Sequence, residues 1–113
     1  MSKFGFYSDK SAAISFESHL SGLEEHAKTL LLDLRNFVKS RGSNVIEEIR
    51  PHRIVYAKSL TFRTFLDIQP RNNCLIVSIR KSRNQPVITH TVNTSQEAED
   101  VKYQIAEAYK TIR

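Results

Sequence analysis

The sequence predicts an α+β fold, an antiparallel sheet of about four to five strands with N- and C-terminal helices packed on one face. Apolar residues recur at helical spacing near both ends of the chain. Between them lie short runs rich in Val, Ile, Phe, Tyr and Thr, which favour strands and are separated by residues typical of turns. The order helix, strands, helix is typical of an antiparallel sheet with one covered face.

The N-terminal third is expected to be mainly helical. Residues 1–11 are mixed and expected to be loose, and residues 12–19 are expected to form a short helical turn. Ser21 and Glu24 have the spacing of a capping box, and Gly42 supplies a stop signal. The apolar stripe between these signals consists of Leu23, Ala27, Leu30, Leu31, Leu34 and Phe37 or Val38. Such a stripe predicts a helix that covers a sheet.

Five strands are expected after this helix, at residues 45–50, 53–58, 61–69, 74–80 and 86–93. The turn from Pro70 to Asn73 combines a fixed φ with two residues that tolerate left-handed geometry. Pro86 suits the start of a strand or a sheet edge. Glu47 and Glu48 are adjacent in the first strand, so they point to opposite faces and cannot form a catalytic pair of carboxylates.

A second helix is expected to close the chain. Thr94 and Glu97 form a capping box, and Glu99 and Asp100 add acidic charge to the first turns. The apolar stripe of this helix consists of Ala98, Val101, Ile105, Ala108, Tyr109 and Ile112. The whole chain, residues 1–113, is therefore interpreted as a single domain.

Cysteine content and hydropathy predict a cytoplasmic protein. Cys74 is the one cysteine of the 113 residues, so neither an intrachain disulfide nor a zinc site built on cysteine pairs is possible. The first residues lack the apolar core of a signal peptide, and no run approaches the ~20 apolar residues of a membrane span. We expect no membrane partner.

The chain is basic, with a formal net charge of +5 and a pI near 9.6, which favours acidic partners such as nucleic acid. Residues 41–83 contain nine Lys and Arg against three Asp and Glu, whereas the segments on either side are nearly neutral. The excess charge is therefore expected on the sheet and its turns.

Alternation along the strands predicts what the uncovered face of the sheet displays. If the helices cover the purely apolar face, the other face carries Arg63, Phe65, Ile76 and Arg80. Guanidinium groups beside aromatic rings are typical of proteins that bind single-stranded nucleic acid, because Arg binds phosphates and aromatic rings stack on bases. A homodimer or other protein interface, and an ordinary solvated face, have the same composition, so three interpretations stay open.

The favoured hypothesis is a nucleic-acid-binding module without catalytic activity, and the alternative is a protein-interaction or homodimerisation module that uses the same face. The Lys and Arg side chains would neutralise phosphates, while Phe65, and less surely Tyr56, would offer a stacking surface. The candidate site residues are Arg53, Lys58, Arg63, Phe65, Arg71, Arg80, Lys81 and Arg83.

Signatures of catalysis are missing from the sequence. The three glycines are not clustered into a phosphate-binding loop, and the four histidines are scattered without metal-ligand spacing. Asp67, the acid inside the basic region, is interpreted as an ion-pair partner of Arg63 or Arg80. No cofactor, metal or convergent set of acid, base and nucleophile is expected, so an enzyme ranks third.

Short motifs carry a family resemblance that covers the chain from Ser21 to Arg113. They are Tyr56-Ala57-Lys58, Thr61-Phe62, Asp67-Ile68-Gln69-Pro70-Arg71, Leu75-Ile76-Val77-Ser78-Ile79 and Glu107-Ala108-Tyr109. Together they resemble the family of small uncharacterised domains called domain of unknown function 5655. Members of that family occur alone and fused to nuclease-like domains, so the resemblance implies a nucleic-acid context by association. The Gly-His-Trp-Gly-like segment of the family is absent, with at most His90 in its place, and no catalytic residue is carried over.

Overall fold

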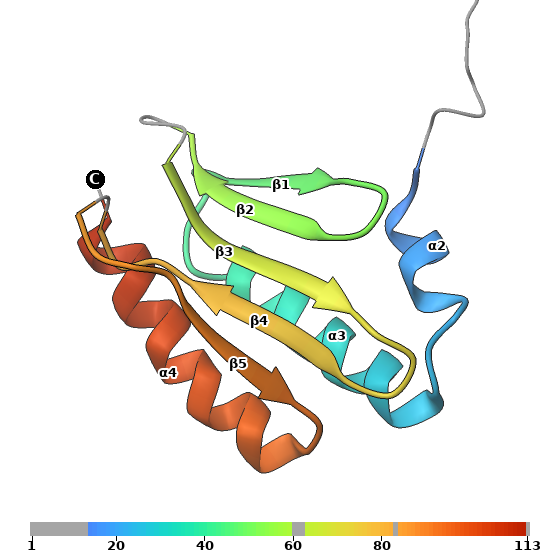
Figure 1. Ribbon diagram of the computed structural model, residues 1–113. Helices are drawn as coiled ribbons and strands as arrows, with labels where there is room; N and C mark the ends of the chain where they lie inside the picture. The colour runs from blue at the N-terminus through green and yellow to red at the C-terminus, as the bar shows by residue number, and fades with distance from the viewer. Residues whose placement is uncertain (1–13, 60–62, 83, 113) are drawn as a thin grey trace, which may run out of the picture.

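The computed structural model describes residues 14–59, 63–82 and 84–112, and it contains one five-stranded sheet (Figure 1). The strands pair in chain order, each antiparallel to the next. They are β1 (Val45–Ile49), β2 (Ile54–Lys58), β3 (Arg63–Pro70), β4 (Leu75–Ile79) and β5 (Ile88–Val92). The predicted α+β fold with an antiparallel sheet is confirmed. The loose segment predicted at residues 1–11 lies outside the described residues.

Three helices among the described residues accompany the sheet: α2 (Phe16–Leu20), α3 (Glu25–Lys39) and α4 (Ser95–Thr111). The long helices α3 and α4 lie on the same face, as the apolar stripes predict (Figure 1). Leu31 and Leu34 of α3 and Ile105 of α4 are fully buried, in one cluster with Leu66 and Val77 of the sheet. No helix among the described residues is long and apolar enough to cross a membrane.

One of the two predicted capping boxes is confirmed, and the other is wrong. The Glu97 N–H donates to Thr94 Oγ1 at 3.1 Å, and Glu97 Oε1 accepts from the Thr94 N–H at 3.1 Å. In contrast, α3 begins at Glu25 after an N-cap, Glu24, whose side chain makes no capping bond. The predicted cap, Ser21, instead ends α2, where its hydroxyl donates to the Ser18 carbonyl at 3.0 Å. Ser21 therefore caps the C-terminus of α2 and not the N-terminus of α3.

The register defines an uncovered face, called here the open face. Val55, Asp67, Ser78 and Thr89 lie in one row across β2, β3, β4 and β5. Their chain neighbours Tyr56, Leu66 and Ile79 are buried in the core on the helix side. Because side chains alternate along a strand, the row that starts at Val55 faces away from the helices.

A β-bulge in β3 changes what the open face displays. Tyr56 pairs with Leu66 and Ala57 pairs with Thr64, so Phe65 is an extra residue without a direct partner. The bulge interrupts the alternation, and Phe65 is fully buried beside Leu66. Its ring packs edge-on against Tyr109 of α4, with centroids 5.6 Å apart. The prediction that Phe65 lies on the open face is therefore wrong.

The same bulge moves Arg63. Arg63 pairs directly with Lys58, and directly paired residues share a face of the sheet. Lys58 is two residues beyond the buried Tyr56, and its amine reaches the end of α4. The register therefore puts Arg63 on the helix side at the end of the sheet, and not on the open face as predicted.

Candidate nucleic-acid interface

The basic residues gather at one end of the molecule. The last turns of α3 and α4 lie at the same end, because Tyr109 of α4 donates a hydrogen bond to Asn44, just beyond α3. The last residue of β2, the first residue of β3 and the segment after β4 reach this end too. We call it the basic end, and its residues are Arg41, Lys58, Arg63, Arg80, Lys81 and Lys110.

Contacts with α4 hold two of these segments in place. Lys58 Nζ donates to the Ile112 carbonyl at 3.0 Å and lies 4.6 Å from the centre of the Tyr109 ring. The Thr111 hydroxyl donates to the Lys81 carbonyl at 2.9 Å. A cation suits the C-terminus of a helix, where the macrodipole is negative. Lys58 therefore stabilises α4, while Lys110 stays largely exposed at 3.9 Å from Glu107.

Acidic residues gather at the opposite end. They occupy the first turns of the two long helices and the N-cap of α3: Glu24, Glu25, Glu97, Glu99 and Asp100. The β3–β4 turn lies at this end, since the Glu24 N–H donates to the Asn72 carbonyl at 2.9 Å. The acids at the N-termini of the long helices and the cations at their C-termini suit the helix dipoles, so the two helices are polarised. Among the described residues, the cations Lys28, Arg50, Arg53 and Arg71 also stand toward the acidic end.

The open face carries a smaller basic feature. A hollow of about 300 Å³ is lined by Arg53, Asp67, Ser78 and Arg80, among other residues. Arg53 Nη1 donates to Asp67 Oδ2 at 2.9 Å, so Asp67 forms an ion pair as predicted, but with Arg53, which the prediction of Arg63 or Arg80 did not name. None of the described strand residues in the open-face rows is aromatic.

The predicted site residues thus separate into groups. The structure brings Lys58, Arg63, Arg80 and Lys81 to the basic end, whereas Arg53 lies on the open face. Arg71 stands in the β3–β4 turn at the acidic end, and Arg53, just before β2, lies toward the same end, away from the basic end. Arg83 lies outside the described residues.

Both predicted stacking residues are inside the core. Phe65 and Tyr56 are fully buried, and the Tyr56 hydroxyl donates to Glu47 Oε2 at 2.7 Å. Neither ring is available to a base, and a dimer interface on the open face would lack Phe65 as an apolar anchor. The bulge that moves Phe65 from the open face into the core has no signal in the sequence, such as a glycine in the strand.

The predicted site did not include Arg41 or Lys110. Arg41 lies just after α3, and Lys110 lies in the last turn of α4. Arg41 also stacks on Phe37, with its guanidinium carbon 4.0 Å from the ring centre. A cation at a helix C-terminus is a readable signal. That both helices end at the same place is a property of their packing.

The described groups with shifted pKa values take part in hydrogen-bonded ion pairs or, for Tyr56, in a hydrogen bond to Glu47. Burial would raise the pKa of Glu47, but hydrogen bonds from Arg35 and Tyr56 outweigh it and lower that pKa. Hydrogen bonds to Asp33 and Glu99 raise the pKa of Lys102. Within residues 14–59, 63–82 and 84–112, no three His, Cys, Asp or Glu side chains are grouped to hold a metal ion.

Comparison of the chain with family models, curated proteins and solved structures gives no match. The resemblance to the domain of unknown function 5655 family stays a prediction. Function is therefore inferred from the charges and the packing of the chain.

Proposed function

We propose that this chain is a non-catalytic module that binds nucleic acid through its phosphates at the basic end. The observation that carries the proposal is the common end of the two long helices and the sheet, which gathers Arg41, Lys58, Arg63, Arg80, Lys81 and Lys110 opposite the acidic end. In the last two turns of α4, Glu107 is the one acidic residue.

The chemistry of the basic end supports contact with backbone phosphates and not with bases. Arg guanidinium groups bind phosphate oxygens in a bidentate manner, and Lys adds point charge. Phosphate contacts carry little sequence information, and the buried Phe65 and Tyr56 provide no stacking surface. Binding should therefore be independent of sequence and strongly dependent on salt.

A fluorescence-anisotropy titration with a labelled single strand tests this proposal over a range of salt concentrations. Arg41→Gln with Lys110→Gln removes two exposed cations from the basic end, and with them the stack of Arg41 on Phe37. If both contact phosphate, the slope of log affinity against log salt should become shallower by about 1.4, at roughly 0.7 per contact. Affinity at low salt should fall for every strand sequence.

Lys28→Gln with Arg71→Gln is the matched control, because it removes the same charge at the other end. Lys28 resembles Lys110, since each lies three residues after a Glu with which it forms an exposed helical pair. Equal effects of the two double variants would mean that net charge alone drives binding, and would contradict the proposal. Absence of binding at low salt would contradict it too.

A further inference from the structure

Strand β5 is an edge of the sheet with the composition of a pairing surface. Among the described residues, β5 pairs with β4 alone, so one side of its backbone has no strand partner. Val87 and Ile88 are 43% and 54% exposed. No charged residue stands between Pro86 and Ser95. An uncharged edge strand with exposed β-branched residues can add another strand.

The other edge of the sheet is protected in the usual way. Strand β1 has the same length as β5, but it carries the exposed Glu48, whose carboxylate pairs with Arg50 just beyond the strand. Charged side chains on an edge strand discourage pairing with another chain. The contrast within one sheet points to β5 as the edge that accepts a partner.

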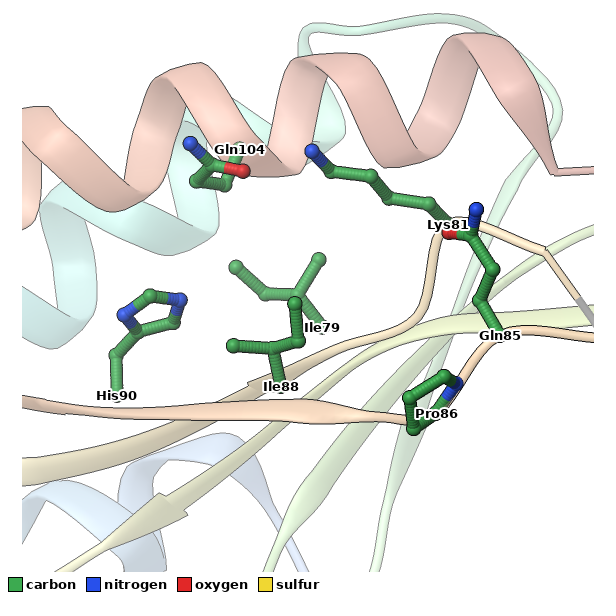
Figure 2. Close-up of a pocket in the computed structure, with 7 residues that line it drawn as sticks. All are labelled: Ile79, Lys81, Gln85, Pro86, Ile88, His90 and Gln104. Carbon is green, nitrogen blue, oxygen red and sulfur yellow. The ribbon is translucent and has the colours of Figure 1, made fainter.

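Two hollows flank β5 on its helix side. The larger, about 260 Å³, is lined by Ile79, Lys81, Gln85, Pro86, Ile88, His90 and Gln104. Figure 2 shows the Ile79 and Ile88 side chains between the strands and α4, with the Lys81 amine above them. His90 lies at the opposite end of the hollow from Pro86. The smaller, about 160 Å³, continues past His90 and is lined by Thr91, Glu97, Asp100 and Val101. One end of the edge is therefore basic and apolar, and the other is acidic.

We propose that the chain forms a two-fold symmetric dimer in which β5 pairs antiparallel with β5 of a second copy. Pairing centred on His90, the middle residue of the strand, sets Ile88 of each copy opposite Val92 of the other. The Lys81 end of one copy then meets the Asp100 end of the second copy at both halves of the interface. This self-complementarity is what a two-fold interface requires.

The helices leave room for such a sheet. Helix α4 packs on β3, β4 and β5, so it lies across β4. In the continuous ten-stranded sheet, the two α4 helices would be about three strand spacings apart, roughly 14 Å. That separation exceeds the roughly 8–10 Å between directly packed helices. Side chains that line the two hollows, such as Gln104 and Lys81, would fill the space.

Sedimentation velocity over a wide concentration range tests the dimer. The wild-type chain should change from monomer to dimer as concentration rises. Ile88→Lys places a charge on the edge and should raise the dimer dissociation constant by about tenfold or more, or about 1.4 kcal/mol. Leu32→Lys is the matched control, because Leu32 is an exposed apolar residue, 41% exposed, on α3. It should leave dimerisation unchanged.

A charge exchange tests the orientation. Lys81→Asp alone and Asp100→Lys alone should each weaken the dimer, while the double variant should recover it. A wild-type chain that stays monomeric at all concentrations overturns the proposal. So does a dimer that responds to Ile76→Lys on the open face and not to Ile88→Lys, or one that the double exchange fails to restore. The inference does not depend on nucleic-acid binding, which is tested at Arg41 and Lys110.

Discussion

Glu47 shows how a single residue can join the sheet to a helix. Strand β1 turns it toward α3, where Oε2 accepts from Arg35 Nε and Oε1 accepts from Arg35 Nη2, both at 2.8 Å. The Tyr56 hydroxyl adds a third bond at 2.7 Å, and Lys39 Nζ lies 3.8 Å away. The hydrogen bond to Glu47 raises the pKa of Arg35 despite burial. Burial, and then the hydrogen bond to Glu47, raises the pKa of Tyr56.

Glu47→Gln should destabilise the protein in a pH-dependent way. Loss of the carboxylate leaves Arg35 without its counter-charge, and we expect a cost of about 2 kcal/mol at neutral pH, below the roughly 3–5 kcal/mol of fully buried pairs. The pKa of Glu47 is lowered from its ordinary value of 4.5. Its ionised form therefore stabilises the folded state above that value, and this contribution is lost as pH falls through the lower folded pKa.

Urea unfolding at neutral and acidic pH measures both effects. The difference between wild type and Glu47→Gln should shrink as pH falls, because acid protonates Glu47 in the wild type. Glu48→Gln is the neighbouring control, since Glu48 is exposed and pairs with Arg50 at 3.0 Å. It should cost less than about 1 kcal/mol. A difference for Glu47→Gln that stays constant with pH would rule out the ion pair as its cause.

At the scale of the element, the bulge in β3 decides the role of that strand. Without the bulge, Phe65 would alternate onto the open face as a candidate for stacking. With the bulge, Phe65 and Leu66 are both buried, and the Phe65 ring contacts Tyr109 on α4. The Arg80 N–H donates to the Phe65 carbonyl at 3.0 Å, so β4 hydrogen-bonds the bulged residue. The bulge thus exchanges a surface aromatic for an added core contact.

Phe65→Ala should therefore act on stability, and not mainly on binding. Loss of a fully buried ring should cost about 3–5 kcal/mol, which is a large part of the stability of a small domain. Thr64→Ala, at the exposed neighbouring position, should change stability by no more than about 0.5 kcal/mol. Thermal and urea unfolding of both variants makes the comparison. A Phe65→Ala variant as stable as wild type would show that the ring is not part of the core.

At the scale of the whole molecule, local patterns were enough to predict the layers. The apolar stripes that contain Leu31 and Ile105 and the β-branched runs need only short-range spacing, and the sheet and helices follow them. Predictions failed where distant parts interact. The bulge at Phe65 places the ring against Tyr109, which is far along the chain. The basic end depends on α3 and α4 ending side by side, which the contact of Tyr109 with Asn44 records and no local motif encodes.

The two proposals make different uses of the basic and acidic ends. Antiparallel pairing of β5 would set the basic end of one copy beside the acidic end of the other. The two basic ends of a dimer would then lie at opposite corners of one continuous sheet. Arg41 and Lys110 of each copy would remain open to a separate strand of nucleic acid, because they are outside the proposed interface, whereas Lys81 would face Asp100 of the second copy.

Hydrogen exchange compares the two edges of the sheet within one sample. The β5 amides that do not bond β4 should become protected as protein concentration rises, because pairing with a second copy satisfies them. Strand β1 is an internal control of equal length, and its exchange should not depend on concentration. Ile88→Lys should abolish the concentration dependence at β5 and leave the slow exchange of the central strands unchanged. If sedimentation shows a dimer while β5 exchanges at the same rate at every concentration, the copies meet elsewhere and the edge-pairing model is wrong.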